Sequence, residues 1–475
     1  MRNHGYLRNY AGTVRLLASR GHTVIIGSRG RERHMAVDTD GYLAALSRDY
    51  PQISTAILPK RRDGWRLIAQ TTRAYRNALR YRHPRFHGAA RLAERAHAKL
   101  DRLAPRLAST LPPWPVARAL SSLAAVVESA IPTDPEIDRT VAALAPDAIV
   151  VTPLVDFDSY QVDYVKTARR LGIPVAAAVA SWDNLTNKGI IAVQPDRVLV
   201  WNEAQKREAI ELHGVRPAHV RVTGAQLFDD WFERRPSTTR EAFCRRVALD
   251  PAKPFFLYLC SSLFIAPEEA AFVQQWIAEL RRSSFPALRG CGVLVRPHPG
   301  HAGPWADVDL SAFGNVVVWP RGGDMPLFED AKAAYFDSLF HSAAIVAINT
   351  TGMIEAGIAG RASFTVLAPE FAATQHGTLH FAHLTAPGFL RTARTMAEHH
   401  AQLDAELRTP STPAALAPFL EQFVRPRGLS TPATPIVAAA MEEVGSITAT
   451  AQRDPLGARV LRPILAGVGR LYSGS

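Results

Sequence analysis

The stretch Val-Leu-Val-Arg-Pro-His-Pro-Gly-His, residues 293–301, decides the fold class. Its three apolar residues are typical of a buried parallel strand, and they run directly into Arg296 and His298. Open α/β sheets bind ligands at the carboxyl ends of their strands. The stretch therefore predicts a parallel sheet with a cation and an imidazole at its ligand-binding edge.

Residues 344–355 repeat this arrangement. An apolar strand leads into the turn Asn-Thr-Thr-Gly, residues 349–352, and then into a helix whose first turn carries Glu355. Backbone N–H groups in such a turn are typical phosphate donors. The two stretches together predict an anion-binding edge in the second half of the chain.

Helical and apolar-strand segments alternate along most of the sequence, which predicts an α/β fold of two facing Rossmann-like doubly wound domains. In the first half we expect helices at 7–19, 134–144, 159–171 and 203–213, and strands at 23–26, 55–58, 148–152, 175–180, 197–201 and 220–223. In the second half we expect strands at 255–259, 293–295, 316–319, 345–348 and 363–366, and helices at 267–282, 329–340 and 353–359. Beyond residue 381 the pattern is helical.

A polar interval at 233–240 separates the two series and sets the predicted domain boundaries. The first domain spans 1–235, with a basic helical insertion at about 60–130, and the second spans 241–425. Residues 426–475 are predicted as a C-terminal helix and a loosely structured tail, because Pro463 and three glycines disfavour a helix over 456–472. Two such domains facing each other would form a cleft.

The start of the sequence is unusual for a doubly wound domain, which normally opens with an apolar strand. Met-Arg-Asn-His-Gly-Tyr is instead typical of the loop that follows such a strand. Either the strand lies upstream or the sheet lacks a central strand. We expect truncation, and we expect it to weaken the first domain.

The composition is that of an ordinary globular protein, with 475 residues, 47% of them apolar and 21% charged. No run approaches the roughly 18 apolar residues of a membrane span, and the start lacks an apolar signal segment, so we expect a cytoplasmic protein. Cys244, Cys260 and Cys291 lack metal or disulfide spacing and are expected to be buried thiols.

The formal net charge of +12 is concentrated in one segment. Between Lys60 and Arg106 there are fourteen Lys or Arg residues against three acidic residues, with aromatic residues interleaved. Such a segment could bind an anionic membrane surface, peripherally on its inner face, or a polyanionic acceptor. A solvated helical hairpin explains it equally well, and no motif supports nucleic-acid binding.

Short motifs resemble one enzyme family. The first helix and second strand of that family are similar to residues 8–9 and 18–24 of this sequence. The V-x-G-N-P-x-x-D segment of the family is similar to residues 222–229, where Ala-Gln replaces Asn-Pro. Residues 296–299, Arg-Pro-His-Pro, are similar to its His-Pro motif, and 349–352 with Glu355 to its nucleotide-holding turn and acid; its G-K-P appears as Gly-Arg-Ala at 360–362. The chain thus resembles GT-B glycosyltransferases of the group that includes UDP-N-acetylglucosamine 2-epimerases, CDP-glycerol glycerophosphotransferases and capsule-polysaccharide transferases.

The resemblance implies an acceptor domain followed by a nucleotide-donor domain. It implies transfer of a sugar from a nucleotide-sugar co-substrate to a glycan, lipid-linked or metabolite acceptor, with no other cofactor and no metal. Polyol-phosphate transfer from CDP-glycerol and epimerisation of UDP-N-acetylglucosamine are alternatives. A catalytically silent nucleotide-sugar or polysaccharide-binding protein is another.

Sugar transfer requires groups that hold the leaving diphosphate and the nucleoside. The residues predicted for the diphosphate are Ser261, Ser262, Arg296, His298, Thr350, Thr351 and Gly352. The resemblance implies that Glu355 accepts hydrogen bonds from the ribose hydroxyls. Simple helix capping is the alternative for the hydroxyl residues, and interaction with the helix dipole is the alternative for Glu355.

The base and the acceptor site are predicted in the first domain. His4 lies in the opening loop and carries an imidazole, the side chain most often used as a general base, while Asp156 follows a strand at the same edge. A polar loop with an aromatic residue supplies the predicted acceptor contacts, which are Trp182, Asp183, Asn184 and Lys188. A turn whose polar side chains bond to their own backbone is the alternative.

Overall fold

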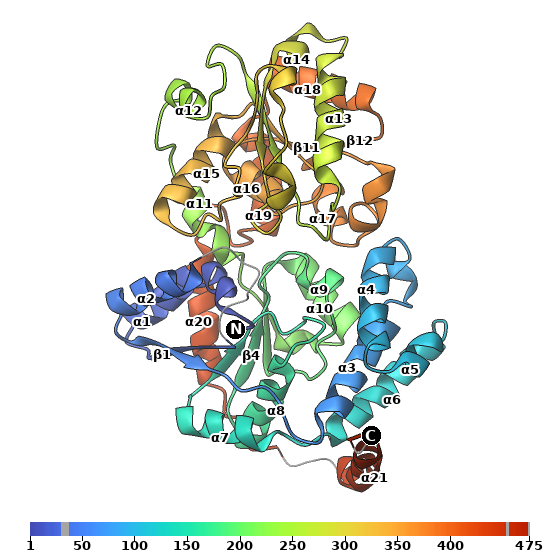
Figure 1. Cartoon of the computed structure of the whole chain (residues 1–475). Helices are drawn as coiled ribbons and strands as arrows, with labels where there is room; N and C mark the ends of the chain where they lie inside the picture. The colour runs from blue at the N-terminus through green and yellow to red at the C-terminus, as the bar shows by residue number, and fades with distance from the viewer. Residues whose placement is uncertain (30–37, 453–455, 474–475) are drawn as a thin grey trace. The chain divides into compact units, whose positions relative to one another are not determined.

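The computed structural model describes residues 1–29, 38–452 and 456–473 and divides into two compact units. The first unit comprises Met1–Glu32, Leu43–Leu227 and Pro432–Ser475, and the second comprises Arg33–Tyr42 and Phe228–Thr431. Each unit contains parallel strands with helices on both sides (Figure 1). The predicted α/β class with two Rossmann-like parts is therefore confirmed.

The second unit is built on one six-stranded parallel sheet. Its strands are β7 (Phe255–Leu259), β8 (Gly292–Arg296), β9 (Val316–Val318), β10 (Ala344–Ala347), β11 (Ser363–Val366) and β12 (Leu390–Ala393). They lie in the order β9-β8-β7-β10-β11-β12. Counted along the chain this order is 3-2-1-4-5-6, which reverses direction between β7 and β10. Doubly wound sheets bind their ligands at the carboxyl ends of these two strands.

Helices cover both faces of this sheet (Figure 1). One face carries α13 (Glu269–Arg281), α14 (Pro286–Gly290) and α18 (Met396–Arg408), and the other carries α12 (Arg240–Arg246), α15 (Glu329–His341) and α16 (Gly352–Ile358). All five residues of β7 are buried. Phe256 packs in the same cluster as Trp276 of α13, whereas the neighbouring Phe255 stacks on Phe243 of α12 with 6.0 Å between ring centroids. The strand thus presents alternate side chains to two apolar layers.

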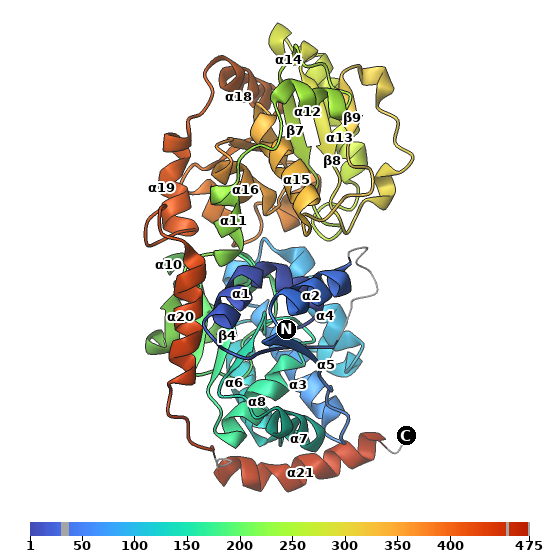
Figure 2. The ribbon, with the colours of Figure 1, turned by 90° about the vertical axis from the view of Figure 1, so that its left-hand side faces the viewer.

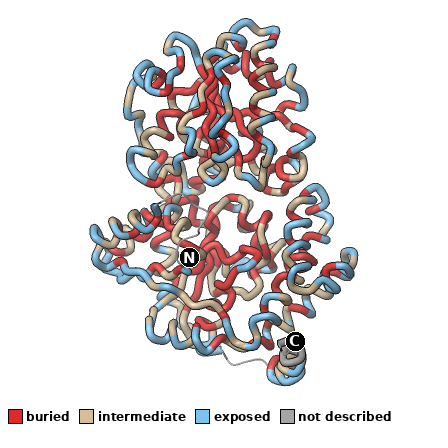
Figure 3. Tube along the Cα trace, viewed as in Figure 1, coloured by how far each residue is buried: buried red, intermediate tan, exposed pale blue. Residues whose placement is uncertain are grey.

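The first unit contains two separate parallel sheets. β1 (Val24–Ser28) pairs with β2 (Ile53–Ile57), and β3 (Ile149–Val151), β4 (Val175–Ala178), β5 (Arg197–Val200) and β6 (Val220–Val222) pair in that order. Helices α7 (Pro135–Leu144), α8 (Gln161–Leu171) and α10 (Glu203–His213) lie on one side, and α1 (Ala11–Ser19) and α20 (Ala433–Gly445) on the other (Figure 2). β4 is fully buried, whereas β1 and β3 are only partly buried (Figure 3).

Four helices fill the predicted basic insertion: α3 (Arg66–Arg80), α4 (Ala90–Asp101), α5 (Pro105–Ser109) and α6 (Val116–Ala130). Against α6 lies α21 (Leu456–Ser473), where Arg462 Nε donates to the carbonyl oxygen of Ala130 at 3.0 Å. The sequence disfavours a helix here because of Pro463 and the glycines; the structure has one, and its packing on α6 compensates for their poor helix propensity.

The remaining elements are short or connecting. They are η1 (His4–Asn9), α2 (Thr39–Asp49), η2 (Pro84–Phe86), α9 (Asn184–Asn187), η3 (Pro217–His219), η4 (Gln226–Phe228), α11 (Asp229–Glu233), η5 (Gly303–Trp305), η6 (Ser311–Phe313), η7 (Pro369–Thr374), α17 (Ala382–Thr385) and α19 (Pro413–Phe423). β12 interrupts the region after residue 381 that the sequence predicts as helical throughout. Parts of the predicted tail, 453–455 and 474–475, lie outside the described residues.

Two expectations drawn from composition can be compared with the structure. The cysteines Cys244, Cys260 and Cys291 are buried free thiols, as predicted. Within the described ranges, every helix is too short or too polar to cross a membrane.

Candidate functional site

The loops after β7 and β10 meet where the strand order of the second unit reverses. The backbone N–H of Asn349 donates to Ser261 Oγ at 3.3 Å, which joins the two loops directly. Ser261 is fully buried, and its own N–H donates to Glu269 Oε2 at 2.6 Å. Ser262 is half-buried, and its carbonyl accepts from Ile265 in the turn that leads to α13. In this conformation Ser261 holds the loop, and its predicted contact with a diphosphate stays a prediction.

Glu269 is a buried carboxyl group behind this loop. Besides the Ser261 N–H, it accepts a hydrogen bond from the Tyr258 hydroxyl at 3.3 Å. Burial raises the pKa of Glu269 to about 8. The sequence did not single this residue out, because an acid in the first turn of a helix is ordinarily explained by the helix dipole.

Arg296 ends β8, next to β7. Its side chain is almost fully buried, and NH1 donates to Ser338 Oγ at 3.2 Å. The guanidinium lies 5.0 Å from the ring centroid of Tyr335 and 5.4 Å from that of Trp319. Burial lowers the pKa of Arg296 to about 10, so the group stays charged at neutral pH. No carboxylate in the described part of the chain forms an ion pair with it.

Glu355 lies in α16 and is joined to Arg296 through Tyr335 of α15. The Tyr335 hydroxyl donates to Glu355 Oε2 at 2.5 Å, and the Arg296 guanidinium lies over the Tyr335 ring in a cation–π contact. Glu355 is also one of the charges that raise the pKa of Arg296 against the larger effect of burial. The structure thus gathers these two predicted residues around one tyrosine. No sequence signal marked Tyr335, since an aromatic residue on a packed helix is common.

The turn before α16 lies tightly against β7. A Cβ atom added at Gly352 would lie 2.6 Å from Leu259 Cδ1 and 2.9 Å from the Tyr335 hydroxyl, so any side chain here would require Leu259 and Tyr335 to move. Thr350 and Thr351 are half-buried, and their carbonyl groups already accept from the first N–H groups of the helix. Because α16 has only seven residues, its amino terminus does not by itself make an anion-binding site.

His298 follows Arg296 by two residues and is half-buried. Its Nδ1 accepts from the backbone N–H of Gly300 at 3.0 Å, which orients the ring. The predicted role of His298 in binding a diphosphate stays a prediction.

In the first unit, Asp156 is a buried carboxylate between two cations. Its Oδ1 lies 3.3 Å from Lys188 Nζ, and its Oδ2 forms an ion pair with the Arg2 guanidinium. Burial opposes ionisation, but Lys188 and Arg2 outweigh it and lower the pKa of Asp156. A carboxylate with a lowered pKa is a weak proton acceptor, so this arrangement suits positioning of Lys188 better than general-base catalysis.

His4 begins η1 and is half-buried. The end of η1 is fixed near β4, because Asn9 Nδ2 donates to the Ala180 carbonyl at 2.8 Å and Gln226 Nε2 donates to the Asn9 carbonyl at 2.9 Å. The predicted catalytic role of His4 stays a prediction.

The predicted acceptor loop bonds largely to itself. Trp182 is 3% exposed, and Asn184 Oδ1 accepts from the Ala180 N–H at 3.2 Å. The Asp183 carboxylate accepts from the side chains of Asn184 and Asn187. These contacts are those of a self-bonded turn containing α9, so acceptor contacts by these residues require movement of the loop.

Several arginines of the basic segment face inward. Arg73 Nε donates to Glu128 at 3.0 Å, and Arg73 NH2 donates to Asp163 at 2.8 Å. Arg61 also pairs with Asp163, and Arg80 donates to the Gly189 carbonyl at 2.6 Å. Part of the positive charge of this segment is therefore compensated inside the first unit. Binding to a membrane surface stays a prediction.

The sequence matches no family model and no curated protein. Among solved structures, the chain is similar to a putative UDP-N-acetylglucosamine 2-epimerase from Listeria monocytogenes, with 10% identity over 96% of this chain and 98% of that one and a TM-score of 0.49. It is similar to a glycosyltransferase from Rickettsia africae, with 10% identity over 92% and 96% of the two chains and a TM-score of 0.49. The S. aureus MnaA–UDP structure gives 10% identity over 96% and 99%, again with a TM-score of 0.49. Because these TM-scores lie below 0.5, the fold assignment rests on the strand order of the two units.

Proposed function

We propose that this protein is a glycosyltransferase of the GT-B kind and that its second unit binds the diphosphate of a nucleotide-sugar donor. The observation that supports this best is Arg296, a buried cation without a carboxylate partner at the edge where the sheet order reverses. A buried charge is unfavourable unless it is paired. A diphosphate would supply the missing anion through charge-assisted hydrogen bonds.

Further roles are assigned to the residues around Arg296. His298, Ser262, Thr350 and Thr351 would add hydrogen bonds to the diphosphate, and Glu355 would accept hydrogen bonds from the ribose hydroxyls. As the bond between the sugar and the diphosphate breaks, the charge on Arg296 would stabilise the leaving group. This charge would do the work of a metal ion, so we expect activity to persist in a chelator.

The acceptor is proposed to bind in the first unit. A base there, for which His4 is our candidate, would take the proton of the acceptor hydroxyl as its oxygen attacks the anomeric carbon. Exposed arginines of the basic segment, among them Arg66, Arg82 and Arg85, are the proposed contact with a lipid-linked acceptor at the cytoplasmic membrane surface.

Calorimetric titration with UDP, CDP, GDP and ADP tests the donor site. We expect one of them to bind, and Arg296→Gln to weaken that binding by about 100-fold or more, because the lost contact is a charged hydrogen bond. Arg282→Gln is the matched control, since Arg282 is exposed on the same unit and makes only a surface ion pair. Unchanged affinity in Arg296→Gln would refute the site.

A panel of nucleotide sugars and CDP-glycerol then tests the reaction. Release of a nucleoside diphosphate supports sugar transfer or hydrolysis, and release of CMP supports polyol-phosphate transfer. Formation of an epimer supports an epimerase. Binding without turnover across the panel would instead indicate a silent binding protein.

A further inference from the structure

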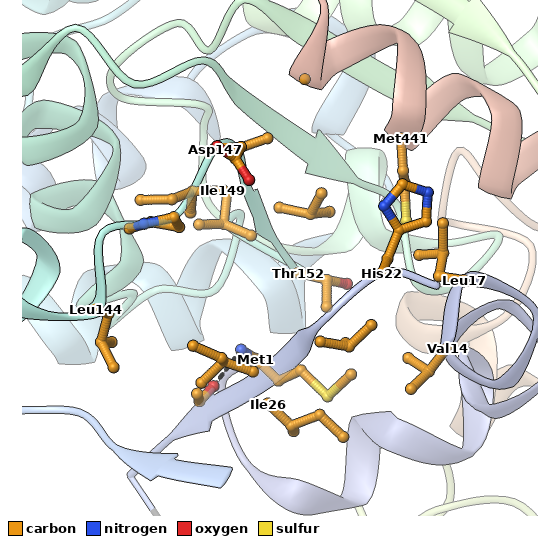
Figure 4. Close-up of a pocket in the computed structure, with 18 of the residues that line it drawn as sticks. Met1, Val14, Leu17, His22, Ile26, Leu144, Asp147, Ile149, Thr152 and Met441 are labelled. Atoms are coloured by element: carbon orange, nitrogen blue, oxygen red, sulfur yellow. Dashed lines mark hydrogen bonds between the residues drawn. The ribbon is translucent and has the colours of Figure 1, made fainter. Parts of the chain in front are cut away.

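A cavity of about 890 Å³ lies inside the first unit between β1 and β3 (Figure 4). Residues 24–27 of β1 form one wall and residues 149–151 of β3 form the other. Apolar side chains of the flanking helices line much of it, namely Val14, Leu17, Val141, Leu144 and Met441, and the lining also includes polar residues, among them His22, Asp147 and Glu442. The cavity is thus a slot between two strand edges with an apolar layer on each side.

Both strands direct backbone hydrogen-bonding groups into this slot. The Val24 N–H donates to Gln52 on the β2 side, and the Ile149 N–H donates to Pro174 on the β4 side. Since successive N–H groups of a strand point in opposite directions, those of Ile25 and Val150 point into the slot. Neither has a hydrogen-bond partner in the part of the chain that the structure describes, and Ile25 is 37% exposed.

The first two residues occupy one end of the slot. The Met1 amino group donates to the Gly27 carbonyl of β1 at 2.6 Å, and the Arg2 N–H donates to the Thr152 carbonyl after β3 at 3.1 Å. Two successive nitrogens therefore bond to opposite sides, as the last residues of a strand between β1 and β3 would. Burial lowers the pKa of the Met1 amino group to about 5.

The second unit contains a strand at the corresponding place. Its central strand β7 lies between β8 and β10, is bonded on both sides and is fully buried. In the first unit, the order β2-β1-slot-β3-β4 leaves the slot where this strand would lie.

We propose that the slot is a binding site for one further β-strand. The occupant is an extended apolar peptide segment of five residues, the length of β1 and β7, which runs parallel to both neighbours and has its carboxyl end at Met1. The strand edges set its direction through backbone hydrogen bonds. The apolar layers on both sides select apolar side chains at every position, as in other strands buried on both faces. This inference is independent of nucleotide binding and of the proposed function.

The first test joins Val-Ile-Leu-Val-Val to the amino end of Met1. A matched chain carries Val-Pro-Leu-Pro-Val, which is also apolar but lacks two N–H donors. We expect the first segment to slow hydrogen exchange at Ile25 and Val150 by about tenfold or more relative to the original chain, and the second to leave it unchanged. Equal exchange in all three chains, or equal slowing by both segments, would overturn the proposal.

A cross-link tests the register independently of stability. The hydrogen bond from Arg2 to Thr152 aligns the second residue before Met1 with Val150. A cysteine at that position of the apolar segment is expected to form a disulfide with Val150→Cys under mild oxidation, because neighbouring strands bring Cα atoms within bonding reach. Arg66→Cys, exposed on α3, is the control. Cross-linking that is equal at both positions, or absent at Val150→Cys, would contradict the proposed strand.

Discussion

The two units share a parallel-sheet plan but differ at its centre. In the second unit the central strand β7 is present, and its end forms the loop that meets the turn after β10. In the first unit β1 and β3 flank a cavity, and at one end of it Met1 bonds to Gly27 of β1 and Arg2 bonds to Thr152 after β3. The comparison indicates that a central strand has two effects: it completes the core, and it sets the position of the loop at its carboxyl end, where we propose that the nucleotide binds.

The units also treat buried charge differently. The first unit pairs Arg73 with both Glu128 and Asp163, so its inner charges compensate one another. The second unit leaves Arg296 without a carboxylate and keeps Glu269 in a site that favours its protonated form. Paired charges indicate a structural role, whereas an unpaired buried cation such as Arg296 fits the binding role that we propose for it.

The largest expected effect comes from breaking the ion cluster of the first unit. Arg73→Met leaves the carboxylates of Glu128 and Asp163 without their main partner and should cost about 3–5 kcal/mol of unfolding free energy. Hydrogen-exchange mass spectrometry, read separately for peptides of each unit, measures this. The loss should be confined to the first unit, and Arg66→Met on the exposed side of α3 should stay within about 0.5 kcal/mol. Equal losses from both variants would mean that the cluster is not structural.

The next effect is a difference in pH dependence between the units. Burial raises the pKa of Glu269 in the folded state to about 8, compared with an ordinary value of 4.5. Between these two pH values the folded state therefore binds more protons than the unfolded state. The stability of the second unit should therefore fall by about 1.4 kcal/mol per pH unit as the pH rises through this range. Glu269→Gln should remove most of this slope.

The first unit should show the opposite trend. Burial opposes ionisation of Glu128 and Asp163, but Arg73 outweighs it and lowers the pKa of both. Their stabilisation is present above the ordinary carboxyl pKa of about 4 and is lost as the pH falls through the lower folded values. Hydrogen exchange at pH 3, pH 5 and pH 8 separates the trends: protection of the first unit should fall from pH 5 to pH 3, and that of the second unit should fall from pH 5 to pH 8. A shared slope in both units would contradict this account.

The sequence was sufficient to predict the elements whose cause is local. Buried strands such as β7 read as continuous apolar runs, and the polar residues at their ends marked the edge that carries Arg296 and Glu355. β12 was missed because Arg391 and Thr392 interrupt its apolar pattern, and because it pairs only with β11 at the edge of the sheet.

The remaining features depend on residues far apart in the chain. Arg73 belongs to a run that is typical of a solvated face, but its partners Glu128 and Asp163 lie 55 and 90 residues away. Tyr335, which joins Arg296 to Glu355, likewise became recognisable only when α15 was packed beside the sheet. Local sequence patterns contain no information on such pairings.

A smaller loss of stability is expected when the close contact between the turn after β10 and strand β7 is disturbed. Gly352→Ala places a methyl group 2.6 Å from Leu259 Cδ1 and should cost about 1–3 kcal/mol by overpacking, together with a loss of nucleotide affinity as Tyr335 is displaced. Gly303→Ala is the matched control, because nothing lies within 4 Å of its added Cβ. Thermal unfolding and calorimetry measure the two effects. A fully stable Gly352→Ala protein with unchanged affinity would show that the close approach is not required.

The smallest effect on stability is expected from replacing Arg296, and it should leave the unfolding free energy unchanged or raise it, whereas the substitutions above lower it. Arg296→Met removes a buried charge that lacks a carboxylate partner, while its apolar chain retains contact with the rings of Trp319 and Tyr335. The variant should unfold at the same free energy as the parent or up to about 1 kcal/mol higher, since replacing a buried charge by a well-packed apolar side chain is often neutral or favourable. Its nucleotide affinity should nevertheless fall as in Arg296→Gln. If Arg296→Met instead destabilised the second unit as strongly as Arg73→Met destabilises the first, Arg296 would be a structural residue, and the proposed difference between the two units in their use of charge would be lost.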